Sequence, residues 1–400
     1  MTSITKSPSH SKETFLFAAS RAFERASFYG IRSILVLYMI NTVKLGEVET
    51  SIIYGLFVSS FIFTQLLGGI LGDLIIGNRR TIILGGILQL LACLSFFIPS
   101  VIGIYIGVGL LSLGSGLFSP NITAQFGKFY LNKTAIMDSG FTILYTILTA
   151  GTFLGITVIT LCAFEDYKIG FVIGSVFMLF SMLLFLMIKE NKEKQNEYIF
   201  NSNDLPKKAI TVSVFILLVS LFWLFFEFFS NRLYSIAAQF LTTEPHSYFW
   251  NTLGSIDTYF SIPLGILFSF LWLSYRYHSK IKISIGFLLA AIGLLTLASI
   301  GVNPSSNAIP LIVIASFFIA LAEFHVGPVL LSLITQNTNP KYLAIVLSLP
   351  YAFSYVVGRL SAICASTDTI TNSIVLVSCS IVSLIISGVL YFIFRKKKES

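Results

Sequence analysis

The sequence predicts an all-α integral membrane protein with twelve transmembrane helices arranged as two six-helix bundles. Of its 400 residues, 55% are hydrophobic and only 11% are charged, and the mean hydropathy is +0.86. A soluble domain carries about 25% charged residues, so the composition indicates a membrane protein. Apolar runs of about 20 residues, the length that crosses a bilayer, recur along the chain, and one polar interior stretch divides them into two equal sets.

The twelve predicted spans alternate with short polar connections. They cover residues 14–41, 50–75, 80–99, 101–127, 137–163, 168–188, 208–240, 247–275, 282–301, 308–335, 342–366 and 371–395. The stretch between the sixth and seventh spans is rich in Lys, Glu and Asn. We therefore expect an N-terminal bundle over residues 1–188, a cytoplasmic linker over 189–207 and a C-terminal bundle over 208–400.

The net charge of +8 is explained by topology. Lys and Arg gather at the C-terminus and at alternate connections, for example Arg79, Lys128 and Lys189. Because cytoplasmic connections carry such an excess, both termini are predicted to be cytoplasmic. The basic charge therefore gives no reason to expect a nucleic-acid partner.

Neither a catalytic centre nor a metal or cofactor site is predicted. The four Cys and four His residues lack the spacing of metal ligands or of a nucleophile and its base. The Cys residues fit small buried hydrophobic positions. Residues 1–13 are polar and the first span carries charges, so no cleavable signal peptide is expected.

The first span contains four charged residues, Arg21, Glu24, Arg25 and Arg32. A charge at the centre of a spanning helix costs roughly 2.5–3.5 kcal/mol on insertion scales. At about 100° per residue the four side chains fall on one side of a helix. They therefore indicate a functional, protein-lined face.

The connection after the second span carries a recognisable signature. Residues 68–80 read GGILGDLIIGNRR, which resembles the cytoplasmic signature G-x-L-x-D…G-x-R-[KR] of the major facilitator superfamily. That resemblance implies the superfamily's fold of two six-helix halves. Asp73 is expected to pair with a base or to cap a neighbouring helix end. The basic residue that usually follows the Asp is Leu74 here.

A more specific resemblance begins in the first span. Residues 24–32 read ERASFYGIR and resemble the first-helix motif ExxERFxYYG of the proton-dependent oligopeptide transporter (POT/PTR) family. Further segments resemble motifs of that family in the same order: residues 114–122, 138–151, 222–227 and 323–332. The resemblance extends over nearly the whole chain.

The resemblance implies an importer of di- and tripeptides that grips the two charged ends of its substrate. Arg25 and Arg32 would attract the carboxylate, since Arg suits bidentate pairing, and Glu323 would hold the ammonium. The other substrate-binding residues expected by resemblance are Tyr29, Tyr145, Trp223 and Asp257.

Some of these residues also fit a structural role. The three aromatic residues suit packing in a Phe-rich membrane protein. Asp257, where the family usually has Asn, suits an interhelical hydrogen bond. A carboxylate in mid-span, such as Glu227 or Glu323, is a functional hypothesis by default.

Two departures from the family motifs concern proton coupling. Arg21 replaces the first Glu of the first-helix motif, and Ser119 replaces a Lys before Pro120-Asn121. In the family these two positions form a salt bridge that is tied to coupling. We expect Arg21 to substitute for the missing Lys and to pair partly with Glu24. Glu227 is then the best candidate for the proton carrier.

The sequence thus predicts a secondary active transporter that imports di- and tripeptides, with proton symport, by alternating access between two six-helix halves. The alternatives are a proton-uncoupled facilitator, a carrier of another small zwitterionic or anionic substrate, and a non-transporting peptide receptor. The predicted partners are peptides, protons and membrane lipid. The expected form is a monomer in a bacterial inner membrane.

Overall fold

The computed structural model describes residues 9–189, 204–243, 256–275, 278–301, 306–364 and 369–399. All regular secondary structure within these ranges is helical, and twelve α-helices there have at least 18 residues. The prediction of an all-α protein with twelve helices of membrane-spanning length is therefore confirmed. The chain divides into two compact units.

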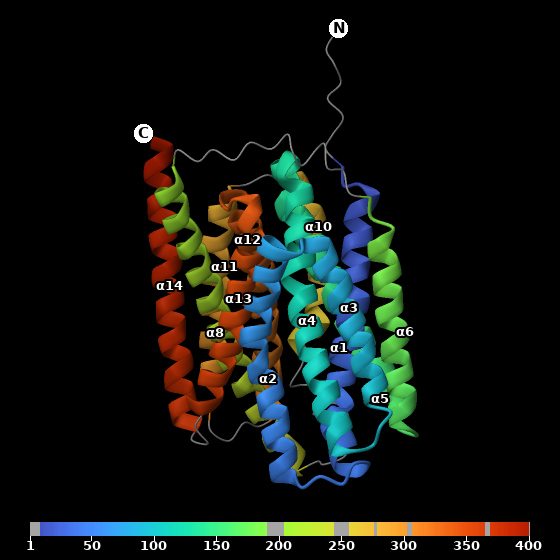
Figure 1. Cartoon of the computed structure of the whole chain (residues 1–400). Coiled ribbons are helices and arrows are strands. Elements are labelled where there is room, and N and C mark those ends of the chain that lie inside the picture. Colours follow the sequence, from blue (N-terminus) through green and yellow to red (C-terminus); the bar gives the residue numbers. More distant parts are fainter. Residues whose placement is uncertain are drawn as a thin grey trace. The chain divides into compact units, whose positions relative to one another are not determined.

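The first unit comprises Met1–Asn201 with two short segments, Ser269–Arg276 and Asn339–Ile345. Its helices pack in two groups, with α1 along α5 and α6, and with α4 along α2 and α3 (Figure 1). Their bounds are α1 Lys12–Asn41, α2 Glu47–Ile70, α3 Asn78–Ser95, α4 Val101–Tyr130, α5 Met137–Ala163 and α6 Tyr167–Leu186.

Small residues bring α1 and α5 into backbone contact. A Cβ atom added to Gly155 would overlap the backbone of Ala26, and one added to Gly151 would overlap that of Ala22. Spacing of small residues by four allows this approach between membrane helices. The contact fixes the distance between α5 and the charged face of α1.

The second unit comprises Ser202–Phe268, Tyr277–Thr338 and Val346–Ser400. Within it, α11 packs along both α12 and α14, and α8 packs against α12. The bounds are α8 Leu205–Thr243, α10 Ile256–Ser274, α11 Ser279–Ala298, α12 Ile309–Asn337, α13 Leu343–Cys364 and α14 Thr369–Glu399. The end of α10 and the start of α13 fall in the short segments of the first unit.

A row of serines on α14 joins it to α11. The hydroxyls of Ser380, Ser383 and Ser387 donate to the carbonyl oxygens of three α11 residues at 3.0, 2.6 and 2.7 Å. The acceptors are Ala291, Phe287 and Ser284. Because apolar helices gain little hydrophobic energy from each other in lipid, such hydrogen bonds contribute to their association.

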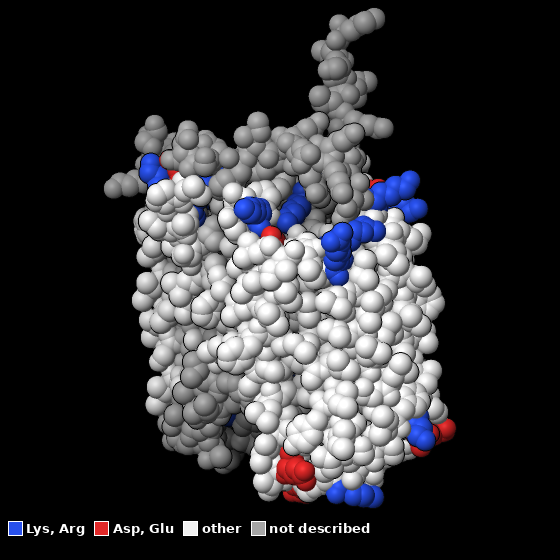
Figure 2. Space-filling view, in the orientation of Figure 1, with Lys and Arg blue, Asp and Glu red and all other residues white. Residues whose placement is uncertain are grey.

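The charges of α1 set it apart from its neighbours. Seven stretches among the described residues are long and apolar enough to cross a membrane, with α4 and α5 counted as one continuous stretch, and α1 is not among them. Its charged residues, from Arg21 to Arg32, explain this. On the face shown in Figure 2, charged side chains of the described residues gather toward the two ends of the helices.

Asp73, in the π-helical turn that follows α2, both pairs with a base and caps a helix, as the sequence predicts. Lys128 Nζ lies 3.6 Å from its Oδ1, and Asn78 Nδ2 donates to that oxygen at 3.0 Å. The backbone N–H of Ile345, in the first turn of α13, donates to Oδ2 at 2.8 Å. Lys128 therefore supplies the positive charge that Leu74 does not.

Candidate functional site

The charged residues of α1 form a buried ion cluster in the first unit. Arg21, Glu24 and Arg25 are 2%, 0% and 5% exposed. Glu24 Oε2 accepts from Arg21 Nη1 at 2.8 Å and from Arg25 Nε at 2.6 Å. Its Oε1 accepts from Arg25 Nη2 and from Gln89 Nε2 of α3, the latter at 3.2 Å. Two guanidinium groups and one carboxylate give this cluster a formal charge of +1.

Two serines of α4 complete the cluster. Arg25 Nη2 donates to Ser115 Oγ at 2.7 Å. Ser119 Oγ accepts from Arg21 Nη1 at 2.9 Å and from Arg25 Nη2 at 3.1 Å. Arg21 thus contacts both Glu24 and Ser119, the two residues that the sequence departures associate with it.

Arg32 forms a second, separate cation centre two turns further along α1. It is half-buried, and its Nε donates to the hydroxyl of Tyr54 on α2 at 2.8 Å. Its Cζ lies 5.8 Å from the ring centroid of Tyr29 and 5.7 Å from that of Tyr54. Tyr29 also faces Arg25, whose Cζ is 5.5 Å from its ring centroid. The ring of Tyr29 therefore lies within cation–π distance of both guanidinium groups.

Tyr145, the remaining site residue predicted in the first unit, lies on α5. It is half-buried, and its backbone carbonyl accepts from Thr149 Oγ1 at 3.0 Å.

The predicted residues of the second unit lie on three helices. Glu323 of α12 is 6% exposed, and its Oε2 accepts from Ser261 Oγ of α10 at 3.1 Å. Trp223 and Glu227 of α8 are half-buried and four residues apart, so both lie on one face of that helix. Asp257 belongs to α10, and its side chain lies outside the described residues.

The structure adds contact residues that the sequence analysis missed. Gln89 and Ser115 bind the ion cluster, Tyr54 binds Arg32 and Ser261 binds Glu323. Polar side chains within apolar spans were the available signal. Ser and Tyr are common in spanning helices, so this signal alone does not select them.

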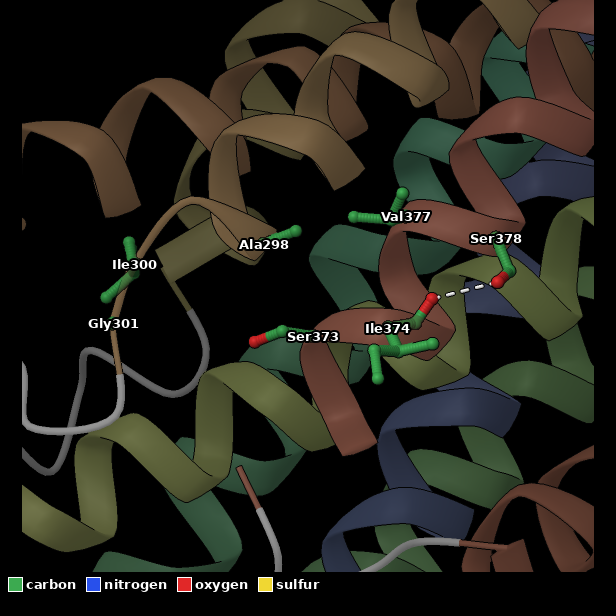
Figure 3. Close-up of a pocket in the computed structure, with 7 residues that line it drawn as sticks. All are labelled: Ala298, Ile300, Gly301, Ser373, Ile374, Val377 and Ser378. Carbon is green, nitrogen blue, oxygen red and sulfur yellow. Dashed lines mark hydrogen bonds between the residues drawn. The ribbon is translucent and has the colours of Figure 1, made fainter. Parts of the chain in front are cut away.

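The second unit has a surface pocket of about 340 Å³ at the end of α11 and the start of α14 (Figure 3). Its lining is mostly apolar, and the hydroxyl of Ser378 donates to the carbonyl of Ile374 in its own helix at 2.9 Å. None of the predicted site residues lines it. Among the described residues, no group of three or more His, Cys, Asp or Glu side chains is placed to bind a metal ion.

Helices of membrane-spanning length that bury charged side chains within two compact units define a multi-pass membrane protein. The chain belongs to the Major Facilitator Superfamily, whose family model matches residues 17–362.

Curated relatives carry names of peptide transporters, in agreement with the resemblance found in the motifs. Dipeptide and tripeptide permease A of Pectobacterium carotovorum subsp. carotovorum (strain PC1) is 26% identical over 214 residues, 52% of this chain and 42% of that protein. Peptide transporter YePEPT of Yersinia enterocolitica subsp. palearctica serotype O:3 (strain YE-P4) is 34% identical over 175 residues, 42% of this chain and 34% of that protein. The chain spans less than half the length of these curated relatives.

Solved structures share the fold over nearly the whole chain. A POT family transporter in complex with a thioalcohol conjugated peptide matches with a TM-score of 0.61 and 17% identity, over 97% of both chains. A bacterial homologue of the iron transporter ferroportin in its outward-facing state matches with a TM-score of 0.73 and 13% identity, over 96% of this chain and 100% of the other. Proteins named for different cargo share this fold, so the substrate has to be inferred from the site.

Proposed function

We propose that the protein is a secondary active transporter that imports di- and tripeptides by alternating access between two six-helix halves, residues 1–188 and 208–400. The observation that carries the proposal is the distribution of charge. The first unit holds two cation centres on α1, and the second holds the buried carboxylate of Glu323. These charges complement the carboxylate and the ammonium of a zwitterionic peptide.

The constant ends of the peptide are the groups to be recognised. Arg32 and the net positive cluster around Arg25 attract the carboxylate, and Glu323 attracts the ammonium. The side chains of Tyr29, Tyr145 and Trp223 supply apolar walls, and Asp257 adds a further polar contact. Gripping both ends leaves the peptide side chains unconstrained, which suits a carrier of many peptides.

The coupling group is proposed to be Glu227. Glu24 is completely buried and accepts four hydrogen bonds, three of them from guanidinium groups. Protonating it would remove the negative charge that is shared by these two buried arginines, which is costly. Glu227 is half-buried and lies outside this cluster. A proton that enters through it gains about 2.3 kcal/mol per 100 mV of membrane potential.

A proton-uncoupled facilitator is the second candidate. It is favoured by Arg21 and Ser119, because the carboxylate and the ammonium expected at these positions are absent and Arg21 instead donates to Ser119. In either case the proposed setting is a bacterial inner membrane, with lipid around a monomer and both termini in the cytoplasm.

The test is uptake of radiolabelled dialanine into proteoliposomes, with and without an inward acid gradient and a negative internal potential. Accumulation that needs the gradient and is blocked by unlabelled di- and tripeptides supports the symporter. Equilibration without accumulation supports the facilitator. Specific binding without uptake would indicate a receptor, and absence of both would contradict a peptide substrate.

A further inference from the structure

Arg32 is held by Tyr54 through two kinds of contact. The phenol oxygen of Tyr54 accepts a hydrogen bond from Arg32 Nε at 2.8 Å. The rings of Tyr54 and Tyr29 lie at similar distances from the guanidinium carbon, 5.7 and 5.8 Å. A long side chain with several rotatable bonds is thereby restricted by a directed hydrogen bond and by two aromatic rings.

This hydrogen bond holds one side of the guanidinium group. Tyr54 accepts from Nε, so this contact does not involve the terminal edge formed by Nη1 and Nη2. Two parallel N–H groups on that edge match the two oxygens of a carboxylate. Holding Arg32 in advance reduces the entropy that is lost when the ligand binds.

Arg25 has a different environment although it lies on the same face of α1. It is 5% exposed, and its Nε and Nη2 atoms donate to Glu24 and to the serines of α4. It shares the carboxylate of Glu24 with Arg21. Arg32 lies seven positions after Arg25, which is about 10 Å along the helix axis. We therefore treat the two guanidinium groups as separate sites for a carboxylate.

We propose that Tyr54 is a positioning residue that orients Arg32 to bind the carboxylate of the peptide, while Arg25 and Glu24 form a fixed charge centre. This proposal rests on the proposed function of peptide transport. It assigns the recognition of the C-terminal carboxylate of the peptide to Arg32 of α1 and Tyr54 of α2.

The experiment compares two ligands that differ only at the carboxyl end. Uptake of radiolabelled dialanine by proteoliposomes gives KM and kcat, and competition by alanyl-alaninamide gives an inhibition constant for a ligand without the carboxylate. For Tyr54→Phe we expect KM for dialanine to rise about tenfold, in keeping with the loss of a hydrogen bond to a charged group. We expect kcat and the inhibition constant of the amide to change less than twofold.

The matched control is Tyr38→Phe, in α1, the helix that carries Arg32. Tyr38 is 2% exposed and its hydroxyl donates to the carbonyl oxygen of Phe96 at 2.6 Å, so this variant removes a tyrosine hydroxyl that bonds to a backbone carbonyl and not to Arg32. This control should leave the ratio of KM for dialanine to the inhibition constant of the amide unchanged. Arg32→Lys should lose the discrimination between dialanine and the amide, and adding Tyr54→Phe to it should change KM less than twofold further.

The outcomes separate this proposal from the proposed function. If wild type transports dialanine but Tyr54→Phe changes neither constant, or changes both by the same factor, the positioning role is wrong while peptide transport stands. If wild type neither transports nor binds dialanine, the proposed function fails and this proposal fails with it. If Tyr54→Phe does not accumulate in the membrane, Arg32→Lys is the variant that tests the contact. An equal change in KM for dialanine and in the inhibition constant of the amide would then contradict the proposal.

Discussion

Arg21 Nη1 donates to Glu24 Oε2 at 2.8 Å and to Ser119 Oγ at 2.9 Å. One guanidinium therefore connects consecutive turns of α1 and also connects α1 to α4. The hypothesis that Arg21 takes the place of a lysine at position 119 now has a geometric basis: an ammonium carried from position 119 would lie close to the same carboxylate.

The first prediction introduces, at positions 21 and 119, the Glu and the Lys of the family motifs. Arg21→Glu places two carboxylates beside each other in a buried cluster, and we expect initial uptake of dialanine to fall at least tenfold. Arg21→Glu combined with Ser119→Lys restores the opposite charges and should recover most of the uptake. Equal uptake by wild type and both variants would show that Arg21 has no electrostatic role.

A second prediction concerns the stability of the ion cluster. Glu24→Gln removes the carboxylate that neutralises two buried arginines, and breaking a buried ion pair costs about 3–5 kcal/mol. We expect a marked decrease in the thermal unfolding temperature of the purified protein in detergent. Glu47→Gln, at an exposed acidic residue in the first turn of α2, is the control. If both variants unfold at the same temperature, the cluster is not important for stability.

The proposed proton carrier gives a third prediction. Glu227→Gln cannot exchange a proton, so uptake should lose its dependence on the acid gradient while exchange of labelled for unlabelled dialanine continues. Both rates are measured in the same proteoliposomes. A variant that still accumulates dialanine in response to the gradient would exclude Glu227 as the coupling group.

The serine row on α14 gives a fourth prediction. Each interhelical hydrogen bond of this kind contributes about 0.6 kcal/mol in membrane proteins. Replacing Ser380, Ser383 and Ser387 together by Ala should therefore lower the free energy of unfolding by about 2 kcal/mol. The exposed Ser378, whose hydroxyl bonds only within α14 among the described contacts, is the control, and Ser378→Ala should have little effect.

A fifth prediction concerns pH and His10, which lies two residues before the start of α1. His10 Nδ1 lies 2.7 Å from the hydroxyl of Tyr130, and Nε2 lies 2.9 Å from Ser139 Oγ. Because Ser139 donates its own proton to the carbonyl of Ser269 at 2.7 Å, the network assigns the imidazole proton to Nε2. Burial, and next the charge of Lys133, lower the pKa of His10 below its ordinary value.

The sign of the pH effect follows from this lowered pKa. Between the lowered value and the ordinary value of about 6.5, the unfolded chain binds more protons than the folded protein. The contribution of His10 to stability is therefore complete above about pH 6.5 and is lost as the pH falls through the pKa of the folded state. Thermal unfolding at pH 8 and pH 5 should show a smaller difference for His10→Gln than for wild type. An identical difference in both proteins would contradict this assignment.

The sequence predicts most of the helices because hydrophobic length is a local property. It also predicts the charged face of α1, since Arg21, Glu24 and Arg25 are close in sequence as well as in space. The partners of that face are less predictable. Gln89 and Tyr54 reach it from other helices, and which polar residue meets which charge depends on how the helices pack.

Backbone contact between α1 and α5 has a consequence for how the charged face can move. With Gly151 and Gly155 pressed against Ala22 and Ala26, α1 has no room to turn about its own axis without separating from α5. Any rearrangement that reorients Arg25 or Arg32 must then move α1 and α5 together as one rigid body. A methyl group added at either glycine would push α5 away from α1 and displace the arginines from their hydrogen-bond partners.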